Sequence, residues 1–253
     1  MVDLVAAGRL IPSVSLVIFD RDGTLIDIHR YWTGMLEMRS AGICRRFGLD
    51  DKARDGLSEI MGIDVRKNKI KSGGPVGIKK RDVVMQAAID YLAGRGITNS
   101  DDVCADIFRD VDERSESRLL ELVVPLPGAK KIVADLRAGG CRCAIATSDM
   151  KKRALLTMDV IGMTDAFDMM VGADEVARPK PAPDMIHRII GRLHADLLET
   201  VMVGDASVDI EMGINAGVKA SIGVCSGLGS HASLASLTNY VVGGIADIEI
   251  KTR

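Results

Sequence analysis

Short, almost wholly apolar runs recur along the chain and indicate candidate strands. They cover residues 15–19, 143–146, 169–173 and 201–204, with weaker examples at 221–224 and 240–242. An apolar run of four or five residues without alternation is typical of a parallel strand that is covered on both faces. The pattern therefore predicts a buried, mostly parallel sheet.

Amphipathic segments with helical periodicity separate these runs. They cover residues 127–138, 151–161, 183–193 and 208–216. Strands that alternate with helices in this way form doubly wound sheets with right-handed crossovers. We therefore predict the α/β class: a Rossmann-like, doubly wound parallel sheet that binds its ligand at the carboxyl ends of the strands.

One long stretch breaks the alternation. Between residues 27 and 125 the pattern predicts helices at 30–47, 51–61, 79–93 and 101–122, and no buried strand. A helical block between the first two strands of a sheet is expected to be an insertion whose two ends return close together. The prediction is a core domain of residues 1–26 and 126–253, and an inserted all-helical domain of residues 27–125.

Composition narrows the class of function. The chain has 253 residues, 47% hydrophobic and 27% charged, with a net charge of −2. One Trp, three Tyr and four Phe are few for a protein that stacks nucleic-acid bases on aromatic side chains. The balanced charge argues against a surface that binds polyanions. We expect no nucleic-acid partner.

The sequence indicates neither a membrane nor an oxidising compartment. No apolar run approaches the roughly 18 residues that cross a bilayer, and the first residues lack the basic head of a signal peptide. The five cysteines are odd in number, and only Cys141 and Cys143 are close in sequence, so they suit the thiols of a reducing compartment. We expect a cytoplasmic protein, a monomer or a homodimer, without a membrane partner.

Polar clusters follow the predicted strands at the ends where a ligand would bind. The first is Asp-Arg-Asp-Gly-Thr at 20–24, and the second is Thr-Ser-Asp at 147–149. A third places Lys180 between two prolines, and a fourth places Asp205 after a strand and Asp209 in the first turn of the next helix. Because the carboxyl ends of parallel strands meet at one edge, these clusters predict a single site rich in carboxylates.

The order of these motifs resembles that of the haloacid dehalogenase superfamily. DxDGT after the first strand, a Thr after the second, then a Lys, then GDxxxD all stand in the order of that superfamily. The resemblance covers the sheet, about residues 13–26 and 126–240, and the inserted helices occupy the place of the superfamily's helical cap of type C1. It implies a hydrolase similar to phosphoglycolate phosphatase.

By this resemblance, two aspartates carry the chemistry. Asp20 would be the nucleophile that forms an aspartyl-phosphate, and Asp22 the general acid for the leaving alcohol and the base for the incoming water. Magnesium, a hard cation, would be held by the Asp20 side chain, the Asp22 backbone carbonyl and Asp205. Asp209 would act on the metal through water or from behind these ligands.

Three further residues are implied in binding the phosphoryl group. Thr147 would donate its hydroxyl, Lys180 would join nucleophile and phosphate by its positive charge, and Ser148 lies beside Thr147. Because Ser148 and Asp149 precede a helix, capping of that helix is the favoured interpretation of both, and a contact of Ser148 with the phosphoryl group is the alternative. Arg21 is expected either to point outward or to aid an anionic substrate.

A basic, glycine-rich segment at 61–75 lies between two predicted helices of the insertion. It contains Arg66, Lys67, Lys69 and Lys71. In capped relatives this region contacts the leaving group, so the resemblance implies selection of an acidic or phosphorylated substrate. The alternative is a solvated loop.

The leading functional prediction is a magnesium-dependent phosphatase. It would hydrolyse a small phosphorylated metabolite, of the phosphoglycolate or sugar phosphate class, through the aspartyl-phosphate. The alternatives are a phosphomutase similar to β-phosphoglucomutase, which shares the same core residues, and a catalytically idle binding module on the same fold.

Overall fold

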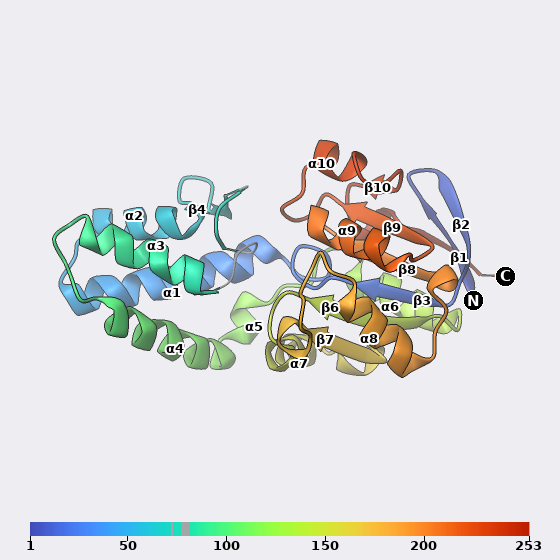
Figure 1. The fold of residues 1–253 in the computed structure, drawn as a ribbon, viewed down its shortest axis with the longest axis horizontal. Helices are drawn as coiled ribbons and strands as arrows, with labels where there is room; N and C mark the ends of the chain where they lie inside the picture. Colours follow the sequence, from blue (N-terminus) through green and yellow to red (C-terminus); the bar gives the residue numbers. More distant parts are fainter. Residues whose placement is uncertain (72, 77–80, 253) are drawn as a thin grey trace. The chain divides into compact units, whose positions relative to one another are not determined.

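The computed structural model describes residues 1–71, 73–76 and 81–252 of the chain (Figure 1). They form two compact units. One combines Met1–Asp27 with Val123–Arg253, and the other is Ile28–Leu122. The first unit contains the main sheet, and the second is inserted in the chain after the first strand of that sheet.

A six-stranded sheet of order β10-β9-β8-β3-β6-β7 forms the centre of the first unit. Its neighbouring strands pair in parallel. The strands are β3 (Leu16–Phe19), β6 (Arg142–Thr147), β7 (Met169–Gly172), β8 (Thr200–Gly204), β9 (Ala220–Val224) and β10 (Val241–Val242). Since β3 lies between β8 and β6, the chain winds outward from the centre in both directions. The predicted α/β class and doubly wound parallel sheet are confirmed.

In the described part of the chain, five helices pack on this sheet. They are α6 (Ala129–Ala138), α7 (Lys151–Val160), α8 (Asp184–Leu193), α9 (Ser207–Ala216) and α10 (His231–Ala235). Ile18 of β3 and Met202 of β8 share a fully buried cluster with Ile186 of α8 and Met212 of α9. Burying each such side chain contributes about 1.5–3 kcal/mol. This layer holds the carboxyl ends of the central strands in place.

A second sheet in the same unit joins the two ends of the chain. It has three antiparallel strands in the order β11-β1-β2. These are β1 (Val2–Ala6), β2 (Arg9–Val14) and β11 (Glu249–Thr252). Ala7 and Gly8 link β1 to β2 with φ values of 51° and 71°, the geometry of a tight hairpin turn. The sequence pattern did not predict this sheet, although Gly8 between two apolar runs was a signal for the hairpin.

The second unit is built mainly from helices, as predicted. They are α1 (Ile28–Phe47), α2 (Asp51–Met61), α3 (Arg81–Ala93), α4 (Asp101–Ser117) and α5 (Leu119–Leu122). The predicted start of the third helix, at residues 79 and 80, lies outside the described residues. The Asp50 side chain accepts a hydrogen bond from the Ala53 amide, which caps α2. Among the described residues, no helix is long and apolar enough to cross a membrane.

The predicted loop between the second and third helices contains a small hairpin. Its strands, β4 (Ile63–Asp64) and β5 (Lys69–Ile70), pair in antiparallel orientation. The Ile70 amide donates to Nδ1 of His29 at 3.3 Å, which ties the hairpin to the start of α1. The described part of the second unit is therefore helical apart from this hairpin.

Candidate active site

Three loops meet at the carboxyl edge of the central strands. Asp20 follows β3, Thr147 ends β6 and Asp205 follows β8. The parallel register places Phe19 of β3 opposite Ile145 of β6 and Val203 of β8, so the loops begin at the same height. The Asp20 amide then donates to the carbonyl of Val203 at 2.8 Å. Residues far apart in sequence are thus brought to one edge.

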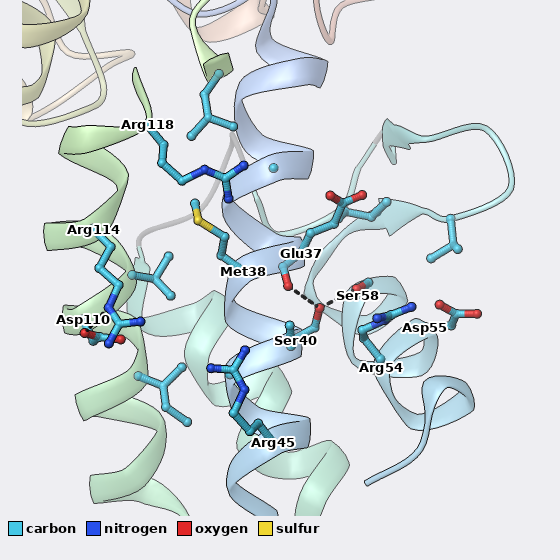
Figure 2. A pocket seen from close by; sticks show the side chains of 18 of the residues that line it. Glu37, Met38, Ser40, Arg45, Arg54, Asp55, Ser58, Asp110, Arg114 and Arg118 are labelled. Carbon is cyan, nitrogen blue, oxygen red and sulfur yellow. Dashed lines mark hydrogen bonds and ion pairs between the residues drawn. The ribbon is translucent and has the colours of Figure 1, made fainter. Parts of the chain in front are cut away.

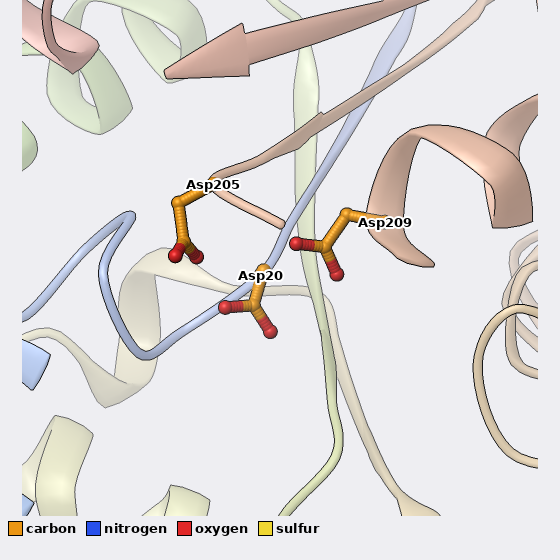
Figure 3. Close-up of side chains that lie close together, drawn as sticks. All are labelled: Asp20, Asp205 and Asp209. Carbon is orange, nitrogen blue, oxygen red and sulfur yellow. The ribbon is translucent and has the colours of Figure 1, made fainter. Parts of the chain in front are cut away.

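Asp20, Asp205 and Asp209 form a buried carboxylate cluster (Figure 3). Each contributes one oxygen atom to a group in which all atoms lie within 4.8 Å of one another. Oxygen donors from carboxylates suit a hard divalent cation such as Mg²⁺. The donor set therefore fits a metal of that kind.

Lys180 lies beside this cluster and contacts two of its members. Its Nζ donates to Oδ1 of Asp20 and to Oδ1 of Asp209, both at 2.6 Å, and its side chain is 2% exposed. The other oxygen of Asp209 accepts from the Ala206 amide at 2.9 Å. Asp209 stands in the first turn of α9, where the helix dipole favours negative charge. Asp209 thereby holds Lys180 against Asp20.

The buried cluster carries an excess of negative charge. When ionised, three carboxylates and one ammonium carry a net charge of −2. Burial raises the pKa of Asp20 to about 7, opposed by Lys180 and reinforced by Asp209 and Asp22. Burial also raises the pKa of Asp205 well above its usual value, and Asp20 and Asp209 add to the rise. Burial lowers the pKa of Lys180, but its two carboxylate partners outweigh that effect and raise it.

A tight turn at Gly23 brings the 20–24 loop against Asp205. Gly23 has a φ of +83°, and a Cβ atom there would lie 2.6 Å from the carboxyl group of Asp205. An ordinary residue would therefore be strained and would also clash. Thr24 Oγ1 donates to Oδ1 of Asp205 at 3.4 Å. The glycine of DxDGT is needed for the close approach of the two motifs.

The segment 226–229 after β9 also holds Asp205, although no motif in the sequence indicated it. The Leu228 amide donates to Oδ2 of Asp205 at 2.7 Å. Ser226 Oγ donates to the carbonyl of Gly23 at 2.7 Å. A Cβ on Gly227 would lie 1.9 Å from Oδ2 of Asp205. Glycines directly after a strand were the signal that could have drawn attention to this loop.

Arg21 is fully buried, so the expectation that it points outward is wrong. Its Nε and Nη2 donate to the two carboxylate oxygens of Asp22 at 3.1 and 2.6 Å, and Nη2 also donates to Asp149 at 2.8 Å. A buried guanidinium is tolerated only with such partners. Burial raises the pKa of Asp22, while Arg21 opposes the rise.

The loop after β6 places Thr147 inside and Ser148 outside. Thr147 is buried and its Oγ1 accepts from the Asp149 amide at 3.1 Å, whereas Ser148 is exposed. The interpretation that Ser148 and Asp149 cap the next helix is wrong, because the N-cap of α7 is Met150 and makes no side-chain cap. The Lys151 amide donates instead to Asp174. One oxygen of the Asp149 carboxylate accepts from the Met150 amide at 2.8 Å, and the other accepts from Arg21 at 2.8 Å.

The basic residues of the hairpin segment belong to the second unit. Arg66, Lys67 and Lys69 are exposed and Lys71 is half-buried. Lys67 lies 3.6 Å from Asp64, and Lys71 lies 3.3 Å from Glu59. Acidic neighbours therefore offset part of the positive charge that the sequence shows here.

Comparison with known proteins gives a family match for most of the chain. The family model of haloacid dehalogenase-like hydrolases matches residues 17–223. A "Probable phosphatase IndB" from Dickeya dadantii is 30% identical over 228 residues, which is 90% of this chain and 88% of that protein. A phosphoglycolate phosphatase from Rhodobacter capsulatus is 27% identical over 209 residues, 80% of each chain.

A solved structure has the same fold. The crystal structure of a predicted phosphoglycolate phosphatase from Haemophilus somnus superposes with a TM-score of 0.73. The alignment covers 94% of this chain and 97% of that chain at 19% identity. The similarity includes the sheet and the inserted helices.

Proposed function

We propose that this protein, which belongs to the haloacid dehalogenase-like hydrolase family, is a magnesium-dependent phosphatase of a small phosphorylated metabolite. Its phosphatase relatives place it among the phosphoric monoester hydrolases. The observation that carries the finer proposal is the contact of Lys180 with both Asp20 and Asp209 beside Asp205. A nucleophile, a cation and a metal-binding set thus share one buried site.

Magnesium fits the carboxylate cluster. Asp20 and Asp205 would hold it with the backbone carbonyl of Asp22, and Asp209 would act from behind by fixing Lys180. When bound, the metal supplies positive charge that offsets the repulsion between the carboxylates and the phosphoryl group. The net charge of −2 in the cluster supports a divalent rather than a monovalent cation.

Asp20 is the proposed nucleophile. One of its oxygens attacks phosphorus, the bond from phosphorus to the substrate oxygen breaks, and an aspartyl-phosphate forms. Lys180 approaches Asp20 to 2.6 Å, so its charge offsets the negative charge that gathers on the phosphoryl oxygens. The nucleophile is held by its own backbone bond to Val203.

Asp22 is the proposed acid and base. As acid it gives a proton to the departing alkoxide, and as base it takes a proton from the water that attacks phosphorus. The bond from phosphorus to Asp20 then breaks and inorganic phosphate leaves. The side chain of Asp22 is 14% exposed, whereas Arg21 behind it is fully enclosed. Asp22 is therefore the member of that pair that can reach a ligand.

Thr147 and Ser148 are the proposed phosphoryl-binding residues beside Lys180. The Thr147 oxygen accepts from the Asp149 amide, which leaves its own proton for a phosphoryl oxygen. Ser148 is exposed and can add a second hydroxyl. The helical unit, with its basic hairpin segment, is the proposed source of selectivity for a substrate of the phosphoglycolate or sugar phosphate class.

The experiment measures phosphate release when the protein is incubated with magnesium and each member of a panel of phosphorylated metabolites. Phosphate release from at least one phosphoglycolate or sugar phosphate substrate is expected, and Asp20→Asn should lower it by at least about 1,000-fold. Asp135→Asn is the matched control, since Asp135 pairs with Lys131 on the surface of α6 and should leave activity unchanged. No release from any substrate would contradict the proposal. Rapid conversion of a sugar 1-phosphate to its 6-phosphate would favour a phosphomutase instead.

A reducing, cytoplasmic compartment is part of the proposal. Cys44, Cys104, Cys141 and Cys143 are free and buried, and Cys225 is free and half-buried. Thiol titration of the denatured protein, isolated without reductant, is expected to find five free thiols. A disulfide would contradict this placement.

A further inference from the structure

We propose that Arg21 is a positioning residue that holds the carboxylate of Asp22 in its working orientation, and that Asp149 holds Arg21 in turn. The inference rests on the proposed function, because it assigns to Asp22 the proton transfers described above. It adds a residue at the variable position of DxDGT and a partner 128 residues away.

The contact between Arg21 and Asp22 has the geometry of a fork. Nε lies 3.1 Å from Oδ1 of Asp22, and Nη2 lies 2.6 Å from Oδ2. Two parallel bonds to one carboxylate restrict rotation about its side-chain bonds, which a single contact would not do. The orientation of Asp22 is therefore set by the guanidinium plane.

The guanidinium is itself held by contacts with α7 and the loop before it. Nη2 donates to Oδ2 of Asp149 at 2.8 Å, and Nη1 donates to Oγ1 of Thr157 at 3.4 Å. The Thr157 hydroxyl gives its proton to the carbonyl of Ala154, so its oxygen is available as an acceptor. Arg21 therefore connects the first motif to the element that follows the second.

The burial of Arg21 indicates that it positions Asp22 and does not bind the substrate itself. Arg21 is fully buried, while the side chains of Asp22 and Asp149 are 14% and 13% exposed. A ligand can reach Asp22 without moving Arg21, but it cannot reach the guanidinium without displacing its partners. Arg21 therefore acts through Asp22.

Charge explains why Asp149 belongs to the unit. Arg153 Nε lies 3.6 Å from Oδ2 of Asp149. Two arginines and two aspartates balance, so this group adds no net charge beside the phosphoryl site. Without Asp149, Arg21 would have one carboxylate partner fewer in a buried position, which is costly.

The test measures kcat/KM for two substrates with different leaving groups. One is the best alkyl phosphate of the panel, whose alkoxide needs a proton to leave, and the other is acetyl phosphate, whose acetate does not. Because kcat/KM includes steps only up to departure of the leaving group, it isolates the acid role of Asp22. General acid catalysis contributes about 100- to 10,000-fold.

Arg21→Gln is expected to lower kcat/KM by about 30- to 100-fold for the alkyl phosphate and by less than about threefold for acetyl phosphate. Arg21→Lys is expected to recover part of the loss, since it restores the charge without the fork. In a protein that already carries Asp22→Asn, adding Arg21→Gln should lower kcat/KM for the alkyl phosphate by less than about a further twofold. The reason is that both changes remove the same function. Arg137→Gln is the matched control, a partly exposed arginine that pairs with Asp168 in the same unit.

Equal losses on both substrates, or full additivity with Asp22→Asn, would overturn the inference and indicate a purely structural role. A change confined to KM would also overturn it. If Arg21→Gln does not fold, Asp149→Asn serves as the second variant, with an expected loss of about 3- to 10-fold on the alkyl phosphate alone. A wild-type protein that releases no phosphate overturns the proposed function and this inference together. An active wild type with an additive Arg21→Gln overturns only the inference.

Discussion

Two groups of charged residues, one in each unit of the molecule, lie in opposite surroundings. In the sheet unit, Lys180 and Asp209 are each 2% exposed and lie 2.6 Å apart. The helical unit has a cavity of about 990 Å³ lined by α1, α2 and α4 (Figure 2). Its charged lining includes five arginines, all exposed: Arg45, Arg46, Arg54, Arg114 and Arg118. The charged residues that line the cavity are exposed, whereas Arg39 of the same unit is 3% exposed and pairs with Asp112 at 2.7 Å.

The comparison indicates that burial, rather than the number of charges, raises the pKa of a carboxyl group. Around the cavity, Arg114 pairs with Asp110 at 2.7 Å while both side chains are at least half exposed. Water screens such a pair, and its contribution is about 0–1 kcal/mol. Around Asp20 the same kind of contact is enclosed, and the pKa of the carboxyl rises to about 7. Three predictions test this contrast, from the largest expected effect to the smallest.

The largest effect is expected from Lys180→Met. The change leaves Asp20 and Asp209 buried without their cation, so the free energy of unfolding should fall by about 3–5 kcal/mol. Phosphatase activity should fall by about 100- to 1,000-fold. Arg114→Gln is the counterpart in the helical unit and should change stability by no more than about 0.5 kcal/mol. Urea unfolding of the two variants measures these changes in the free energy of unfolding. Equal losses in the two variants would contradict the contrast between the buried and the exposed ion pairs.

The second effect is stabilisation by magnesium. At about 100 times its dissociation constant, magnesium adds about 2.7 kcal/mol, or a rise in Tm of roughly 5–10 °C. The pKa of Asp20 is raised to about 7 by burial, so the metal-free protein loses stability as pH rises through that value and the carboxylates ionise. Protons also compete with the metal below it. The rise in Tm should therefore be larger near pH 8 than near pH 6.

Melting curves with EDTA and with excess magnesium check this prediction. Asp205→Asn is the control, because it removes one proposed ligand and one of the repelling charges. That variant should be more stable than the wild type without metal near pH 8, and it should gain little from magnesium. A rise in Tm that is the same at both pH values would contradict the burial argument.

The smallest of the three effects is expected from Gly23→Ala. The residue has a φ of +83°, and the new Cβ would lie 2.6 Å from the Asp205 carboxyl group. Strain of this kind costs about 1–3 kcal/mol, and activity should fall because Asp205 must move. Gly8→Ala is the matched control: its φ is +71°, but nothing lies within 4 Å of the new atom. If both variants keep full activity and lose equal stability, the contact with Asp205 has no role.

Much of the fold could be predicted because local patterns of apolar and polar residues indicate its strands and helices. The six strands of the parallel sheet match the six apolar runs, and the helices of the insertion match its periodic segments. Local patterns do not contain information on pairing between the ends of the chain, so the sheet of β1, β2 and β11 was not predicted. The two-residue strands β4 and β5 are too short to show a period.

Some residues of the candidate site could likewise be predicted from local sequence, and others could not. Asp20, Asp205 and Asp209 could be selected because each directly follows a strand or begins a helix in the sequence. Two interpretations of Arg21 stayed open, pointing outward or aiding an anionic substrate, because its neighbours in sequence do not reveal its partner Asp149. The loop that holds Asp205 through the Leu228 amide was missed because a backbone donor leaves no mark on residue type.

By itself, the sequence determined the order of strands and helices and the polar residues at the strand ends, since both depend on neighbours along the chain. Only the tertiary structure decided which charges meet. Lys180 reaches Asp20 across 160 residues, and Arg21 reaches Asp149 across 128. The physical reason is that the energy of a charge depends on its burial and on the atoms within a few ångströms. The sequence pattern allows this arginine to point outward or to aid an anionic substrate, whereas in the fold it is an enclosed partner of Asp22.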